Sequence, residues 1–296
     1  MTTITQATVG QLKQISRFGL DAIEKVLMEE IDLDNPNAQR VIERGDEFSA
    51  DVREAVLASL NRLSVLSNFA DEEVESSYGY FSGYKKPKWI TEQGNILRRL
   101  FSGVGFADEE IAGGQLPSRA EGWFAIPKWQ TMAKTYGEAV EKVFEIIKKT
   151  RNEKFYNLCE GQLVYNYLRQ SEKSMEAFEK IEKEQMNYDI LVIPAQFGLR
   201  HRGRSVRRAL EVMSADEFGL GAFAVGIMLL THTDRLNHYD DLGIDCTGDE
   251  FSPNANGCFS CKPYFEFSSG KVKFLTRWFD DAVDCFGSAS GFLLQD

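Results

Sequence analysis

The chain has 296 residues, of which 43% are hydrophobic and 12% aromatic, so it is long enough and apolar enough to build a substantial core. Charged residues make up 27% and prolines number only seven, a composition typical of a folded globular protein rather than a disordered one. The formal net charge of −11 disfavours diffuse attraction to nucleic acid or anionic lipid. Any polyanionic partner would therefore need a focused basic patch.

Targeting signals and cysteines bear on the compartment. Residues 1–14 lack the basic stretch and apolar core of a secretory signal. The longest apolar run, residues 218–230, is shorter than the roughly 18 to 20 residues that cross a bilayer, and glycines interrupt it. Five cysteines with irregular spacing do not look like a disulfide framework and suit a reducing environment. We expect a cytoplasmic protein with no membrane partner.

Helical patterns dominate the first part of the chain. Capping-box sequences begin at Thr8 and Thr135, and each precedes apolar residues at helical spacing. Residues 78–122 are rich in Gly, Ser and aromatic residues and predict a long irregular segment with one short helix. The predicted helices cover residues 8–28, 50–63, 90–101, the segment after Thr135, and 171–187.

The pattern changes after Asn187. Residues 189–195, DILVIPA, predict a short buried strand, and Leu242 to Cys246 alternate as a second strand. The turn Ser268-Ser269-Gly270 predicts a hairpin between two apolar runs. The remaining predictions in this part are a helix over 205–213, a capping box over Ser214 to Glu217, a buried helix over 218–230, and hairpin strands around 265–267 and 272–274.

This order of elements predicts an α+β protein with a helix-rich N-terminal half and mixed strands and helices in the C-terminal half. We expect residues 1–296 to form one domain. The alternative is a subdivision into a helical part, residues 1–187, and an α+β part, residues 188–296.

An arginine-rich run, Gly198 to Leu210, reverses the charge of the chain locally. Arginine offers a planar fork that matches phosphate or carboxylate, and a helix beginning near Ser205 would add free backbone N–H groups for an anion. The alternative is an internal ion-pair network with the many carboxylates of the chain. The predicted anion-binding residues are Arg200, Arg202, Arg204, Arg207 and Arg208.

A second basic patch combines Lys85, Lys86 and Lys88 with Trp89 and neighbouring tyrosines. Bases stack on aromatic rings and lysines contact phosphates in grooves for single-stranded nucleic acid, so this pattern is compatible with such a partner. The alternative is that the aromatic side chains anchor an irregular loop to the core.

An acidic turn follows the predicted strand near residue 244. Asp245, Asp249 and Glu250 are oxygen ligands of the kind that bind Mg²⁺ or Ca²⁺, and such a site supports metal-assisted hydrolysis. The spacing fits no calcium loop, and acidic turns at strand ends are often solvated or cap the next element.

The pair Cys258 and Cys261 has zinc-knuckle spacing, and Cys246 and Cys285 are the residues that would complete a four-thiolate zinc site. Because a zinc ribbon uses two such pairs and this chain has one, ordinary reduced thiols are the alternative.

Three segments carry a resemblance to known sequences: DILVIPAQFGLRHRGRSVRRA, EFGLGAFAVGIMLLTH and IDCTGDEF. They are similar to a group of predicted bacterial proteins from uncultured lineages that carry no assigned function. The resemblance spans most of the chain and implies a bacterial, cytoplasmic origin. It transfers no activity and no site residue to this sequence.

Three functional hypotheses remain open. The first is an anion-binding protein whose partner, RNA, single-stranded DNA or a phosphorylated ligand, contacts the arginine run. The second is a metal-dependent hydrolase that acts on a phosphorylated substrate through the acidic turn. The third is a structural or assembly protein whose arginines join subunits. The sequence contains no glycine-rich phosphate loop, nucleophile elbow or HExxH motif.

Overall fold

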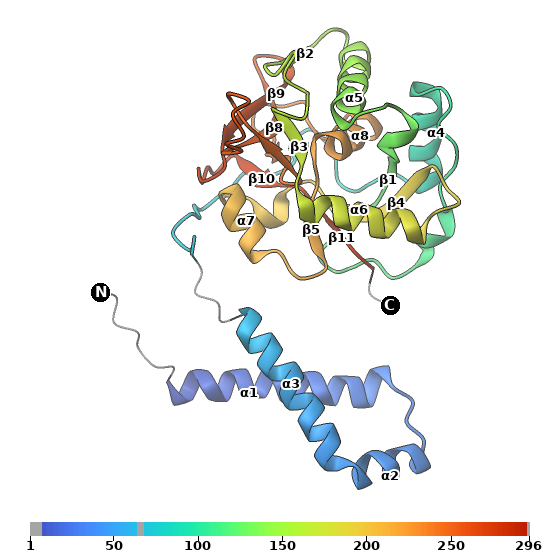
Figure 1. Cartoon of the computed structure of the whole chain (residues 1–296), viewed down its shortest axis with the longest axis vertical. Coiled ribbons are helices and arrows are strands. Elements are labelled where there is room, and N and C mark those ends of the chain that lie inside the picture. The colour runs from blue at the N-terminus through green and yellow to red at the C-terminus, as the bar shows by residue number, and fades with distance from the viewer. Residues whose placement is uncertain (1–7, 64–67, 295–296) are drawn as a thin grey trace. The chain divides into compact units, whose positions relative to one another are not determined.

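The computed structural model describes residues 8–63 and 68–294, and the chain divides after Asn68 into two compact units (Figure 1). The boundary considered near residue 187 lies inside the second unit. There β4 (Ile190–Gln196) pairs antiparallel with β1 (Gly122–Pro127), so residues before and after 187 share one sheet.

The first unit is helical, as its sequence predicts. Thr8 and Gln11 form a complete capping box at the start of α1, and Asp34 caps α2 by accepting from the Asn37 amide at 2.9 Å. No described residue of α1 or α2 is buried. The elements are α1 Val9–Lys25, a π-helical turn Val26–Glu30, α2 Asn35–Glu43 and α3 Gly45–Leu63.

The second unit contains two sheets and five α-helices among its described residues. The smaller sheet has the order β1-β4-β11-β5, with all neighbours antiparallel. The two remaining strands of this sheet are β5 Glu217–Gly219 and β11 Ser290–Phe292. The helices are α4 Ile90–Leu100, α5 Tyr136–Thr150, α6 Glu172–Glu184, α7 Val206–Val212 and α8 Ala222–Thr231. Three 3-10 turns cover Glu109–Gly113, Trp129–Thr131 and Leu199–His201.

The larger sheet is built around the predicted hairpin, which is confirmed. Its order is β10-β6-β8-β7-β3, and β9 pairs with both β8 and β2. Ser269 and Gly270 at the hairpin turn have positive φ, as a tight two-residue turn requires. The strands are β2 Phe155–Asn157, β3 Leu168–Gln170, β6 Gly243–Asp245, β7 Asp249–Phe251, β8 Cys261–Ser268, β9 Lys271–Trp278 and β10 Phe286–Ser288.

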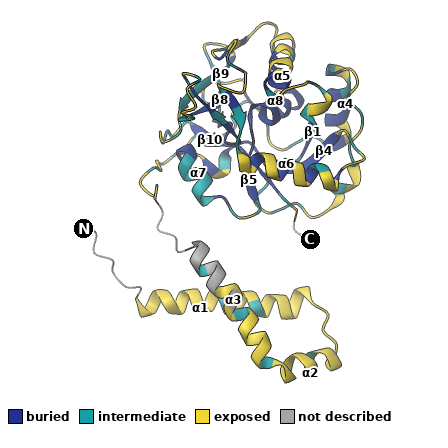
Figure 2. Cartoon of the chain, in the orientation of Figure 1, coloured by how far each residue is buried: buried dark blue, intermediate teal, exposed yellow. Residues whose placement is uncertain are grey.

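Helix α8 lies in the core of the second unit. Every residue of α8 is buried, and the helix contacts α5, β1 and α4 (Figure 2). A helix that is apolar on all sides is stable in water only when protein covers it completely. The predictions of a buried helix in this region and of a buried strand at residues 189–195 are confirmed, and so is the α+β class.

The capping box expected over Ser214 to Glu217 is wrong. Glu217 begins β5 instead, and Phe218 pairs with Gly291 of β11, so α8 starts later, at Ala222. The acceptor for its first N–H group comes from a distant strand, because the Asp249 carboxylate accepts from the Ala222 amide at 2.6 Å.

We predict that Gly226→Ala destabilises the second unit. A Cβ atom at Gly226 would lie 2.6 Å from Cγ1 of Val143 on α5, so the two helices would have to separate. The expected loss in the free energy of unfolding is about 1–3 kcal/mol, measured by urea denaturation. Gly94→Ala on α4 is the control, since its Cβ would meet only the flexible Arg98 side chain at 3.6 Å. Equal effects of the two substitutions would contradict this account of the α5–α8 contact.

Candidate functional site

Four of the five arginines in the run pair with carboxylates of the same chain. The Ser205 side chain accepts from the Arg208 amide and starts α7, which places Arg207 and Arg208 beside the segment that opens the second unit. Arg207 Nε donates to both Glu72 oxygens, at 2.7 and 2.8 Å. These hydrogen bonds lower the pKa of Glu72. Arg207 also stacks on Phe69, 4.4 Å from the ring centre.

Glu73 takes two further arginines. Arg204 and Arg208 donate to the same Glu73 oxygen at 3.1 and 2.5 Å, and Arg208 also pairs with Glu211. Backbone pairing between Glu73 and Arg204 holds the two segments together.

Glu217, which lies in β5, is the partner of Arg200. It is completely buried and accepts from Arg200, from His201 at 2.7 Å and from Ser290 at 2.6 Å. Burial alone would raise the pKa of Glu217, but the hydrogen bonds and charge of His201, Ser290 and Arg200 outweigh it and lower the value to about 2.

Arg202 completes the set by donating to the Tyr78 carbonyl at 2.9 Å. All five arginines of the run therefore have partners within the chain. Four of the five form the internal ion-pair network that the sequence left as an alternative, and a phosphate would have to displace carboxylates to reach these four guanidinium groups.

We predict that Glu72 and Arg207 stabilise the fold as a coupled pair. In a double-mutant cycle with Glu72→Gln and Arg207→Gln, the coupling in the free energy of unfolding is expected to be about 1–2 kcal/mol. The side chains are 13% and 30% exposed, whereas the control pair Glu153 and Lys148 is 68% and 55% exposed and should couple by less than about 0.5 kcal/mol. A coupling no larger than that of the control would contradict the network.

The three carboxylates of the acidic turn do not converge. Asp245 receives two hydrogen bonds from Arg277, at 2.9 and 2.7 Å, while Glu250 pairs with Arg169 at 2.8 Å. Asp249 points to the start of α8. Within residues 8–63 and 68–294, no group of three or more His, Cys, Asp or Glu side chains could hold a metal ion. This finding counts against the candidate Mg²⁺ or Ca²⁺ site, because each carboxylate is engaged elsewhere.

The absence of a three-ligand group among the described residues also applies to the cysteines. Cys258 is exposed and Cys261 is buried, and the described residues bring no third ligand to them, so the zinc arrangement is not formed.

Asp249 instead joins three elements. Its carboxylate accepts from the Ala222 amide at 2.6 Å, and its two oxygens lie 2.8 and 3.0 Å from the donating Tyr136 hydroxyl. The Phe223 amide donates to that hydroxyl at 3.3 Å. Lys262 Nζ donates to the Asp249 carbonyl at 2.7 Å. Burial raises the pKa of Asp249 to about 7, because the surroundings that bond it also exclude water.

We predict that this carboxyl makes stability fall between about pH 4 and pH 7. The folded protein keeps the Asp249 proton to about pH 7, whereas the unfolded chain releases it near the ordinary aspartate value, so folding is favoured at the lower pH. The free energy of unfolding, relative to Asp249→Asn, should drop by about 2–4 kcal/mol over this interval.

The free energies of unfolding of both proteins are measured by urea denaturation at a series of pH values. Because other titrating groups, such as the buried His232, are present in both proteins, their contributions cancel in the difference. Glu176→Gln on the exposed side of α6 is the control for losing a surface carboxylate. A parallel pH dependence of the wild type and Asp249→Asn would contradict the assignment.

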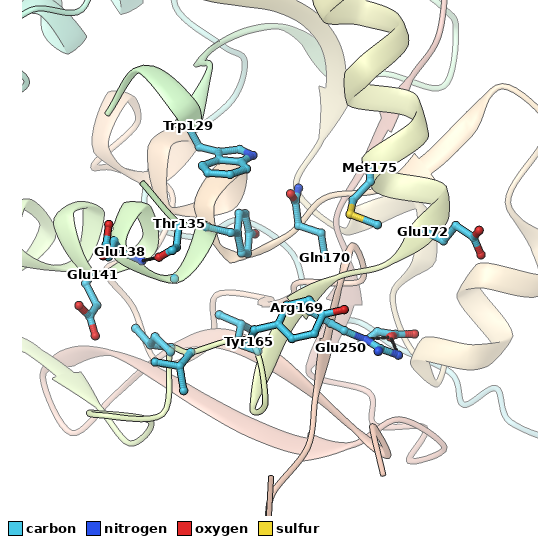
Figure 3. Close-up of a pocket in the computed structure, with 15 residues that line it drawn as sticks. Trp129, Thr135, Glu138, Glu141, Tyr165, Arg169, Gln170, Glu172, Met175 and Glu250 are labelled. Atoms are coloured by element: carbon cyan, nitrogen blue, oxygen red, sulfur yellow. Dashed lines mark hydrogen bonds and ion pairs between the residues drawn. The ribbon is translucent and has the colours of Figure 1, made fainter. Parts of the chain in front are cut away.

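Tyr136 is one of the residues that line a cleft of about 740 Å³ (Figure 3). Trp129 and Tyr165 line opposite sides of it in the figure, and Trp129 packs edge-on to Tyr136 with ring centres 6.0 Å apart. The apolar part of the lining is completed by Leu163, Val164, Leu168 and Met175. The 3-10 turn at Trp129, the first turns of α5 and α6, strand β3 and the segment before it thus build one aromatic and apolar cleft.

The charged residues of the cleft are mostly acidic. Arg169 is already engaged, since it pairs with Glu250 and stacks 3.7 Å from the ring centre of Phe259. The other glutamates of the lining form no ion pair with any residue that the structure describes. These are Glu138, Glu141 and Glu172.

Sequence reasoning missed this cleft. The capping box at Thr135 correctly predicted where α5 starts, but nothing in that pattern indicates that Tyr136 and Glu138 line a cavity. The sequence offers Glu250 as a candidate metal ligand, whereas in the structure it pairs with Arg169 at the cleft. The residues around Trp129 and Tyr165 in the sequence form no motif that indicates a place in a cleft.

The second basic patch remains at the surface. Trp89 is 81% exposed, Lys85 and Lys86 are exposed, and Lys88 makes a 3.6 Å ion pair with Glu92. Tyr84 is the aromatic residue that anchors the segment, since only 3% of it is exposed.

Comparison with known proteins gives no match: no family model, no curated protein and no solved structure is similar to this chain. No helix within the described residues is long and apolar enough to cross a membrane.

Proposed function

We propose that the protein binds a small organic cation in the cleft lined by Trp129, Tyr136 and Tyr165. The observation that carries the proposal is the combination of three aromatic rings with glutamates that form no ion pair with any residue of the described ranges. A cation is attracted to the negative face of an aromatic ring and to carboxylates, and organic ammonium ions are recognised by such surroundings. A volume of about 740 Å³ suits a ligand of drug-like size.

The charge balance opposes an anionic ligand. The one arginine in the lining, Arg169, is held by Glu250 at 2.8 Å, so it offers little free positive charge. A phosphorylated ligand would instead face Glu138, Glu141 and Glu172. The proposed activity is therefore binding of an amine or ammonium compound rather than hydrolysis of a phosphorylated substrate. The proposed location is cytoplasmic, because the five irregularly spaced cysteines suit a reducing compartment.

We predict that benzyltrimethylammonium binds the cleft and that Trp129→Ala weakens its binding about 2- to 30-fold, through the loss of a cation–π contact. Glu141→Gln should weaken binding in the same range, because a neutral amide cannot balance the charge. The measurement is isothermal titration calorimetry at low ionic strength. Glu145→Gln is the matched control, because Glu145 lies one turn further along α5 and outside the cleft lining.

The neutral isostere neopentylbenzene separates charge from shape. We expect it to bind more weakly than the ammonium compound. Equal affinity of the two compounds, or no effect of both Trp129→Ala and Glu141→Gln, would overturn the proposal.

A further inference from the structure

A second surface lies outside the cleft, at the segment that leads into α4. Trp89 is 81% exposed, although burying a tryptophan is normally one of the larger gains in folding. Lys85 and Lys86 beside it are exposed. Residues 78–91 contain three lysines and no acidic residue, in a chain of net charge −11. An exposed large aromatic side chain beside exposed cations is characteristic of an interaction surface.

The backbone that carries these side chains is anchored on its inner side. The Tyr84 ring packs edge-on against Phe197 at 5.3 Å and against His232 at 5.6 Å. The Lys88 amide donates to Nε2 of His232 at 3.0 Å. Because these contacts already fix the backbone of the loop, binding at this surface would cost little conformational entropy.

We propose that the surface formed by Lys85, Lys86, Lys88 and Trp89, called here the Trp89 surface, binds single-stranded nucleic acid. Trp89 offers its ring for stacking with a base, and the lysines contact the neighbouring phosphates. A base stacks on an aromatic face regardless of sequence, and phosphates require the positive charge that this segment supplies. The charge reversal favours a polyanion, and the exposed ring favours one that carries flat bases.

Duplex DNA suits the surface poorly, because its bases are already stacked on one another.

The ion pair between Lys88 and Glu92 is long, at 3.6 Å, and both side chains are substantially exposed, so a phosphate can replace the glutamate at little cost. The proposal is independent of the cleft and its ligand.

The test is fluorescence anisotropy with labelled oligothymidylate of about twelve nucleotides and the full chain. Trp89→Ala should weaken binding about 5- to 150-fold through the lost stacking. Lys85→Ala/Lys86→Ala should weaken binding and flatten its salt dependence. Wild-type affinity should fall about 10- to 20-fold between about 50 mM and about 200 mM salt, as expected for three neutralised phosphates.

Trp278→Ala is the matched control, because Trp278 is also exposed, at 56%, but precedes Asp280 and Asp281 and should not contribute. Circular dichroism of each variant shows whether the fold is retained. In addition, oligothymidylate should protect the wild type from acrylamide quenching of tryptophan fluorescence, and this protection should be absent in Trp89→Phe.

Four results would overturn the proposal. If Trp89→Ala and Trp278→Ala weakened binding equally, the Trp89 ring would have no specific role in binding. Polyglutamate or anionic phosphatidylserine vesicles competing as well as oligothymidylate would show a polyanion or membrane surface without base recognition. Equal quenching of the wild type and Trp89→Phe before any addition would show that another part of the protein, or a second copy, covers the ring. No binding by the wild type at about 50 mM salt would exclude it directly.

Discussion

The carboxylate of Asp249 at the start of α8 is the contact on which the second unit depends. A helix buried on every side cannot expose its first N–H groups to water, so it needs acceptors inside the protein. Asp249 and the Tyr136 hydroxyl supply them, and a Cβ atom on Gly221 would lie only 2.2 Å from the Asp249 carboxylate. Glycine is therefore required for the strand, the tyrosine and the helix end to meet.

This contact also connects the core with the cleft. The hydroxyl of Tyr136 binds Asp249 inside the protein, while its ring forms part of the cleft lining. The position of the ring is thus fixed by a buried hydrogen bond rather than by neighbours on the surface alone. Arg169 is fixed in a similar way, because Glu250 and Phe259 hold its guanidinium on both the polar and the aromatic side. Because buried contacts fix the residues that line the cleft, it can bind a ligand without first being ordered.

The sequence predicts those features that depend on neighbouring residues. The buried strand β4, the β8–β9 hairpin and the start of α5 follow from an apolar run, a Ser-Gly turn and a capping box. The start of α8 does not, because its acceptor Asp249 lies 27 residues further along the chain. The cleft could not be predicted either, because its lining combines residues from turns and strands that are far apart in the sequence. The local pattern of each segment indicates only where a helix or strand starts.

The two basic segments show why charge alone does not identify a binding surface. Both reverse the sign of an acidic chain, yet four of the five arginines in the run pair with carboxylates, which lie as far as 135 residues away in sequence. The guanidinium group favours this outcome, because its planar fork bonds a carboxylate at two points and retains its stacking face. The lysines of residues 85–88 are compact, strongly hydrated charges, and two of the three remain exposed beside an uncovered ring. Most of the positive charge of the arginine run is therefore paired with carboxylates, whereas Lys85 and Lys86 form no ion pair among the described residues. Only the long-range contacts of the fold distinguish the two segments.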